Sequence, residues 1–132
     1  NLPYHSVCTT STHDMTPLRN WWKEDTEKTQ RYYNHVLQRI GEAPDECTAE
    51  IVAQIISNHL KTRSMLTIIP LQDWFAMDDS IKRKDIESER INVPANSTHY
   101  WRYRMHITLE QLLQADNLNN KIVSLIKEAG RK

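Results

Sequence analysis

The chain has 132 residues, a formal net charge of zero and 26% charged residues. This length suffices for one domain with a hydrophobic core, and the balanced charge excludes a broad attraction to nucleic acid or anionic lipid. No apolar run approaches the ~20 residues of a membrane span, and no signal peptide is visible. Because the chain begins with Asn1 rather than methionine, we expect a piece of a longer protein. We expect that protein to be cytoplasmic, because no secretory leader is visible.

Two apolar runs predict strands of a parallel sheet. Residues 5–11 are apolar and β-branched, and residues 66–71 are apolar on both faces, so we expect both to be buried. A polar pair follows each run: His13-Asp14 after the first and Gln72-Asp73 after the second. Polar side chains at the C-terminal ends of parallel strands form the active site of an α/β barrel.

Two helices are predicted between these strands. The first begins at Pro17, whose missing N–H is not needed in a first turn, and its apolar spacing continues through Ile40 to a stop at Gly41. The second opens at Pro44-Asp45, and its apolar stripe ends at Leu60.

The second half of the chain is less regular. Residues 80–90 are strongly charged and predict a solvated turn or short helix, and residues 91–104 predict an irregular segment. Thr108 caps a predicted helical region over 109–129, with a break near Asp116. Its expected buried side consists of Leu112, Leu113, Leu118, Ile122, Leu125 and Ile126.

The alternation of strands and helices predicts an α/β protein with a parallel sheet. Two strands cannot close a barrel, because a (β/α)8 barrel needs eight. The strand count therefore agrees with the expectation of a partial chain.

Three segments, in this order, carry a family resemblance. The first is T-S-T-H-D-M-T at 10–16, followed by R-N-W-W at 19–22. The second is I-I-P-L-Q-D at 68–73, and the third is R-I-N-V-P at 90–94 with Y-W-R-Y-R at 100–104. The chain resembles the C-terminal end of the 4-α-glucanotransferases (amylomaltases or disproportionating enzymes) of glycoside hydrolase family 77.

Three departures from the family pattern refine the resemblance. Asn20 replaces the usual glycine before the tryptophan pair, Ala95-Asn96 replaces Gly-Thr, and 99–104 reads H-Y-W-R-Y-R instead of N-W-R-W-R. These variants resemble the branch that includes the plant cytosolic disproportionating enzyme, which uses maltose and a branched glucan acceptor.

The resemblance implies strands seven and eight, with their helices, of a (β/α)8 barrel, and residues 1–132 as one piece of a single catalytic domain. It also implies retaining transfer of α-1,4-glucan or glucosyl units, through a glucosyl-enzyme formed by one carboxylate while a second handles the proton. A third carboxylate stabilises the oxocarbenium-like transition state, and the T-H-D motif assigns that role to Asp14. His13 and Asn92 would contact the sugar at the −1 subsite, and the other candidate substrate contacts are Gln72, Trp101 and Arg102.

The nucleophile and the acid/base belong to family motifs of the R-x-D and E-D-L type, earlier in the barrel, and are expected outside this chain. The chain alone is therefore expected to be inactive. The implied partners are an α-glucan or malto-oligosaccharide substrate and the rest of the barrel, with self-association of the isolated chain through unpaired sheet edges. No metal or organic cofactor is implied, because retaining transfer needs only carboxylates and hydrogen bonds.

Several alternatives stay open. His13-Asp14 could be a helix cap beside a surface histidine, or the H-D doublet of a metal-dependent phosphohydrolase. His5, Cys8, His13 and Cys47 could bind zinc, although the close ligand pairs of such sites are missing and both cysteines are expected to be reduced thiols. Gln72-Asp73 could brace strand ends, Trp21-Trp22 could be core, and Arg102 and Arg104 could pair with carboxylates. The chain could also be a non-catalytic carbohydrate-binding or adaptor module that stacks sugars on Tyr100, Trp101 and Tyr103.

Overall fold

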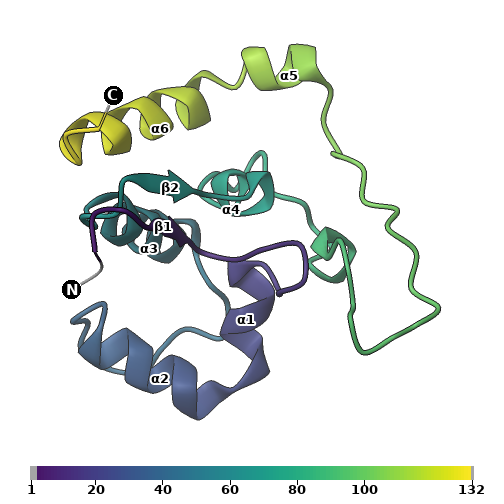
Figure 1. Cartoon of the computed structure of the whole chain (residues 1–132), viewed down its shortest axis with the longest axis horizontal. Helices are drawn as coiled ribbons and strands as arrows, with labels where there is room; N and C mark the ends of the chain where they lie inside the picture. Colours follow the sequence, from purple (N-terminus) through teal and green to yellow (C-terminus); the bar gives the residue numbers. More distant parts are fainter. Residues whose placement is uncertain (1–2, 132) are drawn as a thin grey trace.

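A computed structural model describes residues 3–131 as a two-stranded parallel sheet and a set of helices (Figure 1). Strand β1 (Val7–Thr9) pairs with β2 (Leu66–Ile68) in a register that places Val7 opposite Leu66 and Thr9 opposite Ile68. The predicted parallel pairing is confirmed. The remaining elements are α1 (Leu18–Glu24), α2 (Thr26–His35), α3 (Ala49–Leu60), α4 (Leu71–Phe75), η1 (Glu87–Glu89), α5 (Leu109–Leu113) and α6 (Asp116–Glu128).

The single helix expected from Pro17 to Gly41 is wrong, because the chain breaks it into α1 and α2. Asp25 adopts an extended conformation and its side chain accepts a hydrogen bond from the backbone N–H of Lys28, so it caps a new helix instead of continuing the old one. Helix α2 ends at His35, and Ile40, expected on the apolar face, is 98% exposed in the turn that follows.

The second predicted helix exists but begins later than Pro44-Asp45. Helix α3 starts at Ala49, and the Thr48 hydroxyl accepts the backbone N–H of Ile51 at its N-terminus. Its apolar stripe is buried as expected, and the helix ends at Leu60.

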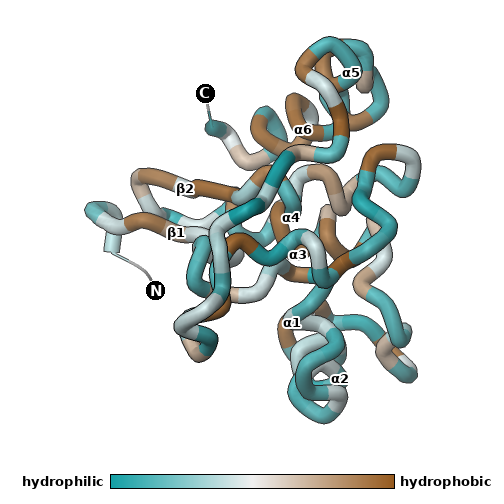
Figure 2. Tube along the Cα trace, turned by 90° about the vertical axis from the view of Figure 1, so that its right-hand side faces the viewer, coloured by the Kyte–Doolittle hydropathy of each residue, from teal (hydrophilic) through white to brown (hydrophobic). Residues whose placement is uncertain are grey.

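The strands are shorter and more exposed than their apolar sequences predict. Strand β2 ends at Ile68, and Leu71-Gln72-Asp73 form the start of α4, because Pro70 suits the position before a helix. Val7, Leu66 and Ile68 are about half exposed. Figure 2 shows β2 as a hydrophobic segment at the outer surface of the molecule. The expectation of strands buried on both faces is therefore wrong for this chain.

The core lies between the helices rather than against the sheet. Trp22 of α1, the apolar face of α3, Phe75 of α4 and Leu118 of α6 pack together and are almost fully buried. The Trp22 indole donates a hydrogen bond to the Pro44 carbonyl at 2.8 Å. Trp22 is thus a core residue, as its position beside a helix start suggests.

The C-terminal region contains the predicted break. Thr108 and Gln111 form a reciprocal capping box at the start of α5, which ends before α6 begins at Asp116. Leu118 is buried, but Leu113, expected on the buried side, is 79% exposed. Among the described residues, no helix has the length and apolar character to cross a membrane.

Candidate active site

The loop between β1 and α1 carries His13 and Asp14, and a distant segment lies against it. The Asn92 side-chain amide donates to Asp14 Oδ1 at 2.6 Å, and the Asn92 backbone N–H donates to the His13 carbonyl at 3.2 Å. His13 Nε2 lies 3.4 Å from Asp14 Oδ2, and both side chains are 52% exposed. The first and third motifs therefore meet, 78 residues apart in the chain.

Aromatic side chains extend this cluster. The Trp101 ring lies against His13, with ring centroids 5.0 Å apart, and is 58% exposed. Arg102 stacks its guanidinium over the Tyr100 ring at 5.0 Å. Within the part of the chain that the structure describes, Arg102 and Arg104 form no ion pair, so the alternative that they pair with carboxylates is not seen there. Arg104 instead donates to the Tyr103 carbonyl.

A buried polar layer lies beneath the loop. Asp73 of α4 is 1% exposed, and its carboxylate accepts hydrogen bonds from the Thr10 hydroxyl and the Leu18 backbone N–H. Burial raises the pKa of Asp73, and these hydrogen bonds oppose the rise. Since Pro17 offers no side-chain cap to α1, Asp73 supplies one from another element. Asp73 therefore braces the end of β1 to the start of α1.

Gln72, the neighbour of Asp73, is also buried. Its amide donates to the Glu89 carbonyl at 3.1 Å, and it lines a small cavity together with His13 and Glu89. It thus lies directly below the exposed pair His13-Asp14 without being exposed itself.

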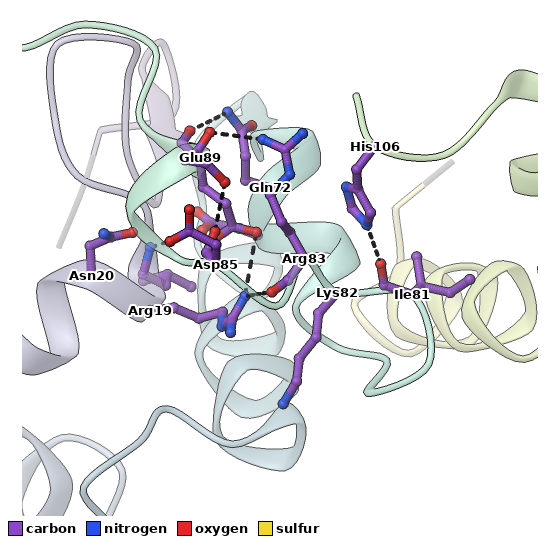
Figure 3. A network of polar contacts seen from close by, with 12 residues as sticks. Arg19, Asn20, Gln72, Ile81, Lys82, Arg83, Asp85, Glu89 and His106 are labelled. Atoms are coloured by element: carbon purple, nitrogen blue, oxygen red, sulfur yellow. Dashed lines mark hydrogen bonds and ion pairs between the residues drawn. The ribbon is translucent and has the colours of Figure 1, made fainter. Parts of the chain in front are cut away.

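The charged run 80–90 is not simply solvated. Glu89 is 1% exposed and lies 3.4 Å from Nη1 of Arg19, which is also buried (Figure 3). Burial raises the pKa of Glu89 to about 7, while the Arg19 guanidinium lowers it by less. The expectation of a solvated face is wrong at Glu89, because hydrophobic periodicity does not reveal a carboxylate that is buried with a cation.

The sequence patterns missed Arg19, Glu89 and Arg83 as members of this region. The letters R-x-D, a family motif expected outside this chain, also occur once, at 83–85. They lie in a turn before η1, where Asp85 Oδ1 accepts the Glu87 backbone N–H at 3.1 Å. This aspartate does not follow a strand and is not placed as a barrel nucleophile.

The described residues hold no group of three or more His, Cys, Asp or Glu arranged for a metal ion. Cys8 and Cys47 are both free thiols, and burial raises the pKa of Cys47 to about 12. Cys47 is therefore a core residue with a protonated thiol at neutral pH.

Comparison with solved structures first defines the class of fold. The amylomaltase from Streptococcus agalactiae, solved in complex with acarbose, aligns with 99% of this chain at a TM-score of 0.72 and 19% sequence identity. The alignment covers 23% of that protein. At this identity the likeness concerns the fold alone: a mixed α/β arrangement with a small parallel sheet, shared with part of a barrel enzyme.

Comparison of sequences then identifies the family. The model of the glycoside hydrolase 77 family, the 4-alpha-glucanotransferases, matches residues 1–110, and the chain belongs to this family. It is 39% identical over 128 residues to the 4-alpha-glucanotransferase DPE2 of Oryza sativa subsp. japonica, covering 97% of this chain and 14% of that protein. A 4-alpha-glucanotransferase of Chlamydia trachomatis is 30% identical over 123 residues, which cover 91% of this chain and 22% of that protein.

The family resemblance inferred from the three motifs is thereby confirmed. The chain spans about a seventh to a fifth of the length of these relatives.

Proposed function

We propose that this chain is the C-terminal part of the catalytic domain of a cytoplasmic, retaining 4-α-glucanotransferase, contributing strands seven and eight and their helices to a (β/α)8 barrel. The parallel pairing of β1 and β2 supports this proposal. So does the position of the His13-Asp14 loop just after β1, since barrel enzymes place their catalytic groups at the C-terminal ends of strands.

The observation that carries the proposal is the hydrogen bond between Asn92 and Asp14. It joins two family motifs that lie 78 residues apart in the chain, and the Asp14 side chain remains 52% exposed. In the proposed mechanism, the Asp14 carboxylate faces the anomeric centre and stabilises the positive charge that develops as the glycosidic bond breaks. His13 and Asn92 donate hydrogen bonds to hydroxyls of the same sugar.

The other proposed contacts divide by exposure. Trp101 offers an exposed ring beside His13, suited to stacking on a sugar, and Arg102 lies close to it in the chain. Gln72 would reach substrate only through the small cavity that it shares with His13. Among the proposed substrate contacts, we therefore expect that of Gln72 to be the weakest. The substrate class is an α-1,4-glucan or malto-oligosaccharide, and no cofactor takes part.

The decisive experiment replaces Asp14 by asparagine in the full-length transferase that contains this chain. The amide keeps an oxygen to accept the Asn92 hydrogen bond but removes the negative charge. Transfer from maltose to glycogen should fall by at least ~10²-fold, as for the loss of one preorganised electrostatic group. Asp45→Asn, which changes an exposed aspartate outside the candidate site, is the matched control and should leave the rate unchanged. Near-normal turnover of Asp14→Asn with an intact fold would refute the proposal.

The isolated chain should be inactive, since we place the nucleophile and the acid/base in the rest of the barrel. Glucose release from maltotriose by the isolated chain, abolished by Asp14→Asn, would contradict this.

The half-exposed apolar strands should also pair with the rest of the barrel or with a second copy. Light scattering that detects only monomers would contradict self-association.

A second candidate function is a non-catalytic carbohydrate-binding module. The exposed rings of Tyr100 and Trp101, 70% and 58% exposed, favour it. Titration calorimetry of the isolated chain with maltoheptaose separates the two functions. A micromolar site favours the module, whereas a barrel piece that lacks most of its subsites should bind far more weakly.

A further inference from the structure

We propose that Arg19 and Glu89 form a positioning pair that sets the Asn92 segment against Asp14. This inference rests on the proposed function, because it assigns the pair a role in the geometry of the transfer site. Neither residue touches the exposed face where the substrate would lie; each acts through Asn92.

The pair links the loop that carries Asp14 to the segment that carries Asn92, because Arg19 lies on α1, the helix that follows the Asp14 loop. Asp14 precedes α1, and Arg19 is the second residue of that helix. The Arg19 guanidinium donates to the Arg83 carbonyl at 2.7 Å and lies 3.4 Å from Glu89 Oε1. One cation on α1 therefore contacts both ends of segment 83–89, three residues before Asn92.

Two further hydrogen bonds hold the same segment. The Gln72 amide donates to the Glu89 carbonyl at 3.1 Å, and the Asn20 amide donates to Glu87 Oε1 at 3.2 Å. Asn20 stands where the resembling family has glycine, which has no side chain to form this bond. Side chains from α1 and α4 thus hold the segment (Figure 3).

The anchored segment is followed, three residues later, by Asn92, which contacts the loop of Asp14. Asn92 binds the loop through its backbone N–H to His13 and through its amide to Asp14 Oδ1. Glu89 also lines the small cavity that His13 lines, so the anchored segment lies next to the loop. A displacement of about 1 Å in this segment would break the 2.6 Å bond, and misplacements of that size can cost ~10²-fold in rate.

The burial of the pair argues for a geometric role. The side chains of Arg19 and Glu89 are 8% and 2% exposed. A buried ion pair often stabilises a fold no better than apolar residues of the same size, whereas removing one partner leaves an uncompensated charge. A well-packed apolar pair could replace it in the core, but it could not bind the Arg83 carbonyl, which Arg19 now holds.

The test measures maltose-to-glycogen transfer by the full-length transferase. Glu89→Gln should lower kcat roughly 10-fold, with KM changed by less than about twofold, because the pair orients Asn92 without touching substrate. The matched control is Glu46→Gln, which breaks an ion pair of the same 3.4 Å length between exposed side chains, Lys23 and Glu46. This control should leave kcat unchanged.

A double-mutant cycle with Asn92→Ala distinguishes positioning from a general structural effect. In the Asn92→Ala background, Glu89→Gln should lower kcat no further, whereas its effect on the melting temperature should persist. An equal fall in kcat in both backgrounds, or no fall in the wild-type background, would overturn the proposal. Arg19→Lys, which keeps the charge but loses the planar fork, serves in the same cycle if Glu89→Gln does not fold.

The parallel measurement on Asp14→Asn distinguishes failure of the proposed function from failure of the positioning role. If Asp14→Asn is active, the proposed function itself fails. If Asp14→Asn is inactive and Glu89→Gln behaves as the control does, only the positioning role fails.

Discussion

The carboxylates of the exposed loop differ in burial from those of the polar layer beneath it. The exposed loop carries Asp14, and the polar layer contains Asp73 and Glu89. Asp14 is half exposed and holds one hydrogen bond from Asn92 and a contact with His13. Asp73 and Glu89 are almost fully buried and are held by residues of α1 and the end of β1. The exposed carboxylate is free to meet a ligand, and the buried ones can only hold the backbone that carries it.

This difference gives different expectations for the two regions. A change in the buried layer should alter stability and its dependence on pH, because buried charges depend on their partners. A change in the exposed cluster should alter transfer and leave stability almost intact. Three measurements test the division, from the largest expected effect to the smallest.

Asp73→Ala should produce the largest loss of stability. It removes the acceptor for the Thr10 hydroxyl and for the Leu18 backbone N–H at the uncapped start of α1. We expect the free energy of unfolding to fall by about 3 kcal/mol in urea denaturation, as for a buried charged acceptor. Asp79→Ala, which removes an exposed partner of Lys82, should cost less than about 1 kcal/mol. Equal losses for the two variants would mean that burial does not distinguish these aspartates.

Glu89 should make stability fall as pH rises. Its pKa is about 7 in the fold, above the ordinary 4.5, so between these values the unfolded chain releases the proton and the folded chain keeps it. Stability from Glu89 is thus fully present below pH 4.5 and is lost as pH rises to about 7, by on the order of 3 kcal/mol.

The pH dependence is measured by unfolding in urea at several pH values. Glu89→Gln cannot ionise and should remove this part of the slope, while Glu46→Gln should retain it. A slope that is identical in Glu89→Gln and in the unsubstituted chain would show that Glu89 does not titrate in this range.

Trp101→Ala should have the smallest effect on stability. Its ring is mostly exposed and packs on His13 alone among aromatic partners in the described part of the chain, so we expect a loss of no more than about 1 kcal/mol. In the full-length transferase, KM for malto-oligosaccharide should instead rise several-fold, because the stacking surface is lost. A large drop in melting temperature with unchanged KM would place Trp101 with the structural residues.

The family and the meeting of two of its motifs were more predictable from sequence than the element boundaries. The T-H-D, I-P-L-Q-D and R-I-N-V-P motifs led to a family that the comparisons confirm, and two of them meet in space. The first helix was misjudged because Trp22 and Tyr33 keep helical spacing across Asp25, where the chain turns extended and caps a second helix. Periodicity registers the spacing of apolar residues but not a one-residue break between two helices.

The buried charges were beyond any local pattern. Glu89 lies in a run whose composition is typical of a solvated surface, and its partner Arg19 is 70 residues away in the chain. The exposure of the strands could not be predicted from sequence either. An apolar run indicates that a strand is suited to burial on both faces, but it does not show whether this chain contains the elements that would cover those faces.

By itself, the sequence determined the family and the parallel pairing of two strands, because motifs and local propensities depend on residues close together in the chain. Only the tertiary structure decided that Asp73 caps α1, that Arg19 and Glu89 are buried together and that Asn92 reaches Asp14. These contacts join positions 55 to 78 residues apart, and their energies depend on burial and distance, which exist only once the chain has folded.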